Sequence, residues 1–338
     1  MAFSGALFSP WEQLPVDLVV EITTHLPFTP STLLSLLLVN KRTHDIVTHY
    51  EHCLSKAIGA TQFPTAALVF PPPTLLLPEP LSQPSFRWLS LLAHRTATIS
   101  ALIAKTTSLS QETTYPLPHQ TAHWNAIQRG SLLLLYRLSD QPTQSQKVSF
   151  LLSLPLYALA LLHLELYLAI KIAEEVGEGI INASFARNDT ATRSDICLVF
   201  GELLLKYGPR FLNDVLGHKA DAAQELHSEW MCLDSYQIDG AASSTTYITN
   251  NAPGTVTQAT TNTEDDDNDD AAQGSTDPRK RTLTSYLREA FWRRDGCGVQ
   301  QTSTKMWSLV QSPVLWNMDE AILRHLVLGI EADWKTGI

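Results

Sequence analysis

The amino-acid sequence predicts an all-α protein. Apolar residues recur three and four positions apart in nearly every long apolar stretch, which is the period of an amphipathic helix, and strand-like alternation is scarce. The chain has 338 residues, of which 44% are hydrophobic and 17% are charged, so it can bury a sizeable core. We expect helices at 14–26, 32–56, 86–109, 125–139, 154–176, 195–207 and 221–234.

Residues that begin and end helices support this prediction. Ser194 is a good capping residue for the helix at 195–207, and Gly208 followed by Pro209 should end it. Gly296 follows a helical stretch of the C-terminal segment, as a C-terminal glycine does. These signals indicate separate helices joined by short turns.

The sequence of residues 11–56 predicts three short helices. Pro15 falls in the first helical turn, where its missing N–H costs nothing, and residues 27–32 break the chain before a leucine-rich second segment at 33–39. A domain of about 60 residues buries only about 60% of the surface that its unfolded chain exposes. A unit of this size therefore cannot enclose all its leucines, and we expect it to bind a partner.

This region also contains a series of short motifs at characteristic spacings. They are Leu14-Pro15-Val16-Asp17-Leu18, Ile22, Leu26, Leu33-Leu34-Ser35-Leu36, Leu38-Val39-Asn40-Lys41-Arg42 and Ile46-Val47. In their order and spacing these motifs resemble an F-box. Thr43 departs from the family, which usually has an aromatic residue there, and the loop 28–32 is about two residues longer than is common.

The resemblance implies a non-catalytic, substrate-recruiting subunit of an SCF-type ubiquitin ligase. In such a subunit the F-box binds a Skp-type adaptor, and through it a cullin, while the rest of the chain holds a protein substrate. The rest of this chain is only vaguely similar to the helical regions of fungal F-box proteins. An F-box-containing helical scaffold that acts outside a ligase is the alternative. The residues that the resemblance assigns to adaptor binding are Leu14, Pro15, Leu18, Val19, Ile22, Leu26, Leu33, Leu34, Leu36, Val39 and, at the rim, Lys41.

Four further regions follow the F-box at 11–56. Residues 57–85 should form an extended connector, because seven prolines between 63 and 84 are too many for a helix. Residues 86–238 should form an irregular helical domain, and 239–278 a disordered linker rich in Ser, Thr, Asn and Asp. A helical segment at 279–338 carries four tryptophans that need a core, so it should pack on the helical domain.

The net charge of −10 comes mainly from the linker. Eight carboxylates and no Lys or Arg lie between Asp239 and Asp277, which leaves 24 basic against 26 acidic residues elsewhere. A chain without a basic surplus lacks the electrostatic footprint of a nucleic-acid-binding protein. We therefore expect protein partners and no nucleic acid, in the cytoplasm, the nucleus or both, since the N-terminal residues do not form a secretory signal.

One segment invites a membrane assignment, because 148–164 has no Asp, Glu, Lys or Arg. Pro155 interrupts it and Glu165 ends it, so a helix buried in a helical bundle is the better interpretation, with a membrane anchor as the alternative.

Nothing in the sequence assembles an active site or a metal site. The GxSxG, GxGxxG and GxxxxGK[ST] motifs are missing, and the four cysteines form no CxxC pair. The histidines at 44, 49 and 52 with Cys53 do not share one helical face. We expect no catalytic residue, no metal and no cofactor.

Overall fold

The structure is a computed structural model that describes residues 10–72, 84–112, 121–185, 190–240, 282–298, 301–312 and 320–330. Every regular element among these residues is a helix, which confirms the all-α prediction. The first elements are the 3-10 helix η1 (Pro10–Gln13), α1 (Val16–His25), α2 (Pro30–Leu37), α3 (Lys41–His49), α4 (Glu51–Gln62) and α5 (Pro64–Val69). They are followed by α6 (Phe86–Glu112), α7 (Thr121–Ser139), α8 (Gln144–Ser153), α9 (Leu156–Val176), η2 (Gly179–Ile181), α10 (Thr190–Tyr207), α11 (Pro209–Leu216), α12 (Ala220–Gly240), α13 (Leu283–Asp295), α14 (Thr302–Val310) and α16 (Glu320–Leu328).

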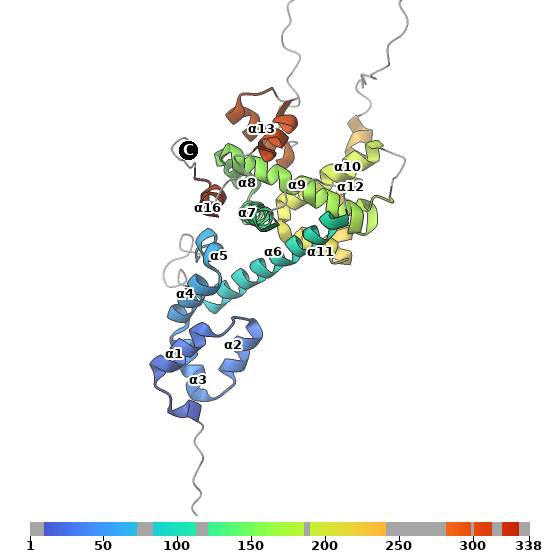
Figure 1. Ribbon diagram of the computed structural model, residues 1–338. Coiled ribbons are helices and arrows are strands. Elements are labelled where there is room, and N and C mark those ends of the chain that lie inside the picture. Colours follow the sequence, from blue (N-terminus) through green and yellow to red (C-terminus); the bar gives the residue numbers. More distant parts are fainter. Residues whose placement is uncertain are drawn as a thin grey trace, which may run out of the picture.

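These helices form two parts (Figure 1). A small N-terminal unit, α1–α3, lies at one end of the molecule, and a larger helical body, α7–α16, lies at the other. The helices α4, α5 and the long α6 run between them. The unit is thus presented at the tip of the molecule, with the body behind it.

The N-terminal unit has a small core made by one face of each of two helices. Val19 of α1 and Val47 of α3 are 1% and 0% exposed, and α1 packs on both α3 and α4. The amide of Gln62, at the end of α4, donates a hydrogen bond to the backbone oxygen of Leu26 at 2.7 Å and accepts one from the backbone N–H of Phe28 at 2.8 Å. These bonds tie the loop between α1 and α2 to the rest of the chain.

The predicted helix at 32–56 is divided into three helices. Pro30 occupies the first helical position of α2, and the Thr29 hydroxyl accepts a hydrogen bond from the Thr32 N–H at 3.0 Å. α2 therefore begins within residues 27–32, which were predicted to break the chain. The Asn40 side chain caps α3 in the same way, by accepting from the Thr43 N–H at 2.7 Å. These caps are local signals that a periodicity pattern does not contain.

The connector is more helical than predicted. The prediction that prolines exclude any helix from 63–84 is wrong for α5, because Pro64 occupies the first turn, where no N–H is needed. The indole N–H of Trp88 donates to the backbone oxygen of Phe70 at 2.9 Å and fixes the end of α5 against α6. Gly59 lets α4 approach α6, since a Cβ there would lie 2.6 Å from the Trp88 ring. Residues 73–83 lie outside the described residues.

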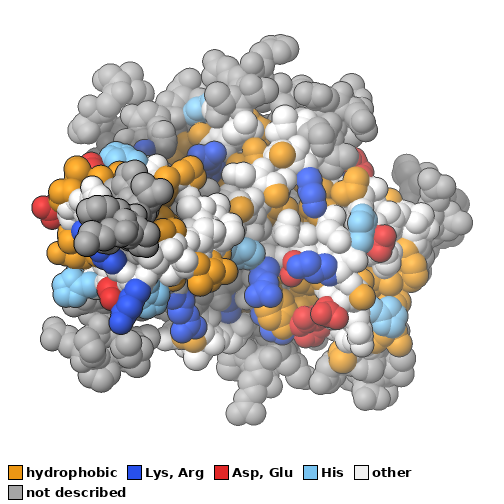
Figure 2. All heavy atoms as spheres, turned by 90° about the horizontal axis from the view of Figure 1, so that it is seen from below, with side chains coloured by type: hydrophobic (Ala, Val, Ile, Leu, Met, Phe, Trp, Pro, Cys, Tyr) orange, Lys and Arg blue, Asp and Glu red, His pale blue; other side chains and the backbone are white. Residues whose placement is uncertain are grey.

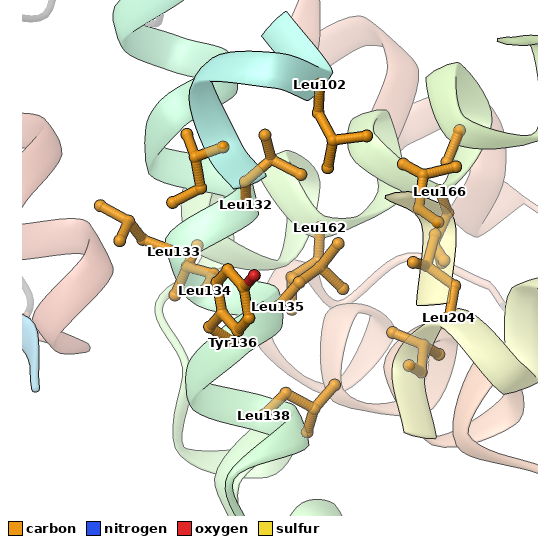
Figure 3. Close-up of a cluster of buried hydrophobic side chains, with 14 of the residues drawn as sticks. Leu102, Leu132, Leu133, Leu134, Leu135, Tyr136, Leu138, Leu162, Leu166 and Leu204 are labelled. Carbon is orange, nitrogen blue, oxygen red and sulfur yellow. The ribbon is translucent and has the colours of Figure 1, made fainter. Parts of the chain in front are cut away.

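The core of the body lies between α7 and α9. Figure 3 shows leucines of α7 beside Leu162 of α9, while Leu166 of α9 lies farther away, on the side of Leu204 of α10, and Leu102 of α6 lies at the top of the cluster. Most of these side chains are fully buried, and α9 buries eleven of its residues. α9 is also the one described helix that is long and apolar enough to cross a membrane, but 61% of its most apolar window is buried inside the structure. It is therefore the core helix of the body, and a membrane span is not indicated.

One carboxyl group lies inside this core. Glu165 is 2% exposed, and its Oε2 atom lies 2.6 Å from the hydroxyl of Ser131, which also lies 2.8 Å from the backbone oxygen of Gln128. A serine hydroxyl has one proton, so it cannot donate to both oxygens at once. A protonated Glu165 would donate to Ser131 and satisfy both contacts. This agrees with the pKa of Glu165, which burial raises to about 7.

The C-terminal helices pack on the body. α13 lies against α8, α9 and α10, α14 lies against α9, and α16 lies against α7. Glu202 of α10 accepts hydrogen bonds from the backbone N–H groups of Leu283 and Thr284 at 2.8 and 2.6 Å, so a carboxylate satisfies the N-terminus of α13. A guanidinium N–H of Arg137 donates to the backbone oxygen of Val327 and holds the end of α16. The chain thus returns to the body after the acidic segment.

One predicted helix boundary is wrong and two are confirmed. Ser194 does not cap α10, because the helix already begins at Thr190 and the Ser194 hydroxyl donates to the Thr190 backbone oxygen at 2.9 Å. The helices α8 and α11 were not predicted. Gly208 and Gly296 end their helices as predicted, with φ values of 74° and 70° that favour glycine. The predicted disordered linker at 239–278 lies outside the described residues from position 241 onward.

Candidate functional site

The N-terminal unit exposes several large apolar side chains on α1, on α2 and directly after α2. Five of the 13 large hydrophobic side chains that are exposed among the described residues fall between positions 18 and 39. We call this set the leucine surface; it comprises Leu18, Ile22, Leu34, Leu38 and Val39. In Figure 2, which views the molecule from the end that carries α1–α3, hydrophobic side chains lie among Lys, Arg and His side chains. Concentrated exposed apolar groups of this kind mark protein interaction sites.

Helical periodicity explains how α1 contributes to this surface. Val19 and Thr23, four residues apart, form its buried face, and the Thr23 hydroxyl donates to the Val19 backbone oxygen at 2.7 Å. Leu18 and Ile22 are also four apart, so they share the next face. They are 49% and 37% exposed. The same helix therefore holds the unit together with one face and presents apolar groups with the other.

The second helix, α2, also contributes exposed apolar side chains. None of its eight residues is buried. Leu34 and Leu38 again lie four positions apart, and they are 57% and 74% exposed. Leu33 and Leu37 pack in part against the core and hold the helix in place. α2 thus has too few neighbours to cover its leucines.

The residues that the F-box resemblance assigns to adaptor binding differ in solvent exposure. Six of them are exposed, namely Pro15, Leu18, Ile22, Leu34, Val39 and Lys41. Four are half-buried, namely Leu14, Leu26, Leu33 and Leu36. The assignment of Val19 to adaptor binding is wrong. Val19 is 1% exposed, so it is a core residue of the unit and offers no surface to a partner. It lies one position from Leu18, and a stripe read from sequence alone does not distinguish the two faces.

Sequence reasoning missed the most exposed member of the surface. Leu38 was assigned to the turn motif and not to partner binding, yet it is 74% exposed. A signal was present in the sequence. Three successive leucines, at positions 36 to 38, follow one another at the end of a short helix, and a helix cannot turn three successive positions toward one neighbour.

Two basic residues, Lys41 and Arg42, begin α3, shortly after the last members of the leucine surface in the sequence. The Arg42 guanidinium donates to the backbone oxygen of Leu14 at 2.6 Å, so Arg42 helps to fix the entry to α1. Lys41 is exposed. Thr43, where the F-box family usually has an aromatic residue, is buried and accepts a hydrogen bond from the indole N–H of Trp11 at 2.8 Å. An aromatic ring thus contacts this position from η1, outside the motif.

Three titratable groups of the body have strongly shifted pKa values, namely His163, Glu165 and Cys197. Glu165 lies in the core, and burial lowers the pKa of His163 to about 4, helped by the charge of Arg288. Burial and the neighbouring Glu174 raise the pKa of the Cys197 thiol to about 11, which makes it a poor nucleophile. No group of three or more His, Cys, Asp or Glu residues in the described part of the chain is placed to hold a metal ion.

Comparison of the chain with protein-family models, with curated proteins and with solved structures finds no match.

Proposed function

We propose that this protein is a non-catalytic adaptor subunit whose N-terminal unit binds a Skp-type adaptor and whose helical body presents a protein substrate to an SCF-type ubiquitin ligase. The observation that carries the proposal is the leucine surface on α1 and α2. Its two pairs of side chains at helical spacing are suited to packing against the groove of a helical partner. The F-box resemblance of the same residues names the class of that partner.

The energetics favour binding over a purely structural role for these side chains. Fully burying a leucine side chain that is otherwise exposed is favourable by about 1.5–3 kcal/mol. Leu34 and Leu38 remain 57% and 74% exposed, so folding of the chain gains little of this burial free energy. Binding of a partner that covers both side chains would gain the rest of it. Fully desolvated, well-packed positions near the centre of an interface carry most of its binding energy.

The connection to the body suits presentation of a substrate. Glu51 of α4 accepts a hydrogen bond from the backbone N–H of Phe86 at 2.8 Å, so the start of α6 is held beside α4. The guanidinium of Arg95 lies 4.1 Å from the centre of the Phe70 ring and 2.6 Å from an oxygen of Asp140. These contacts link α5, α6 and α7, and a rigid link would hold a substrate at a fixed distance from the ligase.

Co-expression with a Skp-type adaptor and a cullin tests the proposal. We expect the full chain to co-purify with both partners and the double variant Leu18→Asp, Leu34→Asp to lose both. Leu91→Asp is the matched control, because Leu91 is also an exposed leucine, at 43%, but lies on α6 outside the unit. Failure of the full chain to bind the adaptor would contradict the proposal. Adaptor binding without the cullin would favour a scaffold that acts outside a ligase.

A further inference from the structure

The helix α1 begins without a capping side chain. Its N-cap residue is Pro15, which has no N–H and whose side chain forms no hydrogen bond. The other two helices of the N-terminal unit begin with a cap, because the Thr29 and Asn40 side chains each accept a hydrogen bond from a backbone N–H group. No local bond of this kind fixes the first turn of α1, so contacts with another helix decide where it lies.

Two side-chain hydrogen bonds hold the segment before α1 against the start of α3. The indole N–H of Trp11 in η1 donates to the hydroxyl oxygen of Thr43 at 2.8 Å, and the guanidinium of Arg42 donates to the backbone oxygen of Leu14 at 2.6 Å. Thr43 is 2% exposed and Trp11 is half-buried, so water has limited access to the first bond. We call these two bonds the η1 latch.

The helix α3 supports both halves of the leucine surface. α2 packs chiefly on α3, and α1 packs on α3 and α4. Leu18 of α1 follows Pro15 by three positions, and its N–H donates to the Pro15 backbone oxygen at 3.1 Å. A displacement of the chain at Leu14 therefore moves Leu18 relative to Leu34 of α2.

We propose that the η1 latch positions Leu18 and Ile22 for the partner of the leucine surface, and that Trp11 and Thr43 are positioning residues for this binding. Thr43 is buried, so it acts through α1 and not by touching the partner. A surface that is already ordered binds more tightly, because less conformational entropy is lost on association. The effect on a Skp-type adaptor rests on the proposed function, whereas the effect on the order of α1 is a property of the free chain.

Two substitutions at one position separate the hydrogen bond from packing. Thr43→Val keeps the branched shape of the side chain but removes the hydroxyl, whereas Thr43→Ser keeps the hydroxyl and removes a buried methyl group. The dissociation constant for a Skp-type adaptor should rise about fivefold in Thr43→Val and less than about twofold in Thr43→Ser. If Thr43 acted by packing alone, the serine variant would be the weaker binder, and this result would overturn the proposal.

The other end of the bond gives an independent variant. Trp11→Phe keeps an aromatic ring but removes the N–H, so it should weaken adaptor binding as much as Thr43→Val does. The double variant should be no weaker than either single variant, because both remove the same bond. Losses that add would overturn the assignment. Trp307→Phe is the matched control, since Trp307 is also half-buried but lies on α14 in the body, and it should leave binding unchanged.

Amide hydrogen exchange of the free full chain tests the latch without any partner. Residues 14–22 should exchange at least about threefold faster in Thr43→Val and Trp11→Phe than in the wild type and in Thr43→Ser, while α4 exchanges at an unchanged rate. Unchanged exchange at 14–22, or equal acceleration in α4, would overturn the latch. A wild-type chain that binds no adaptor would contradict the proposed function, and the exchange rates would then decide on the latch alone.

Discussion

Two leucine-rich helices of this protein have opposite surroundings. α2 buries none of its eight residues, whereas α9 buries eleven of its 21. The difference lies in the neighbours: α9 contacts helices α7, α10, α13 and α14, but α2 packs chiefly on α3. The same residue type thus stabilises the fold in one region and supplies a binding surface in the other. Composition alone does not tell these two uses apart.

The largest expected effect on stability comes from the buried region. Leu162→Ala should lower the free energy of unfolding by about 2–5 kcal/mol, because Leu162 of α9 is 0% exposed and its removal leaves a cavity. Urea denaturation followed by circular dichroism measures the change. Leu38→Ala is the control, since Leu38 is 74% exposed and should change stability by less than about 0.5 kcal/mol. Equal losses in both variants would contradict the comparison.

The buried carboxyl of α9 should make stability depend on pH. The pKa of Glu165 rises from 4.5 to about 7 in the folded protein, so the folded state keeps a proton that the unfolded chain releases. The contribution of Glu165 is therefore complete below pH 4.5 and is lost as the pH rises to about 7, by on the order of 3 kcal/mol. Glu165→Gln should remove this loss.

Urea denaturation at pH 5 and pH 8 measures this effect. The variant should be more stable than the wild type at pH 8 by about 2–3 kcal/mol, and the gain should be much smaller at pH 5. Glu175→Gln, the same change at an exposed position of α9, serves as the control and should not show this pattern. A gain that is equal at both pH values would show that the proton on Glu165 is not its cause.

A smaller effect is expected where the connector joins the two regions. Gly59→Ala would place a Cβ 2.6 Å from the ring of Trp88, so α4 and α6 must move apart. Overpacking of this kind costs about 1–3 kcal/mol. Thermal unfolding should show the loss, and Ala60→Gly, at an exposed position of the same helix, should cost no more than about 1 kcal/mol. Unchanged stability of Gly59→Ala would mean that the contact between the two helices is not tight.

The sequence predicted the fold class and most helices because apolar periodicity is a local property. It failed where a capping side chain or a distant residue decides the outcome. Thr29 and Asn40 start α2 and α3 through single hydrogen bonds, and Glu202 completes the N-terminus of α13 from 81 residues away. Of the candidate site, the α1 and α2 residues could be predicted as a group. Which side of α1 is buried could not, because this depends on α3 and α4, as the neighbours Leu18 and Val19 show.

The position of the C-terminal helices could not be predicted from the sequence. Arg137 and Val327 are 190 positions apart, and nothing in either local sequence indicates that the Arg137 side chain donates a hydrogen bond to the Val327 backbone oxygen. Long-range packing of α16 on α7 decides this contact, whereas local apolar periodicity indicates the leucines of α1 and α2.

The most direct test of the central claim is the dissociation constant for a Skp-type adaptor, measured together with stability. We expect Leu18→Asp with Leu34→Asp to weaken binding at least about 100-fold, which corresponds to about 2.7 kcal/mol, while the free energy of unfolding changes by less than about 1 kcal/mol. Leu91→Asp should leave the dissociation constant unchanged. Binding that is unaffected by the double variant, or lost only together with the fold, would contradict the claim that the exposed leucines of α1 and α2 are the binding surface.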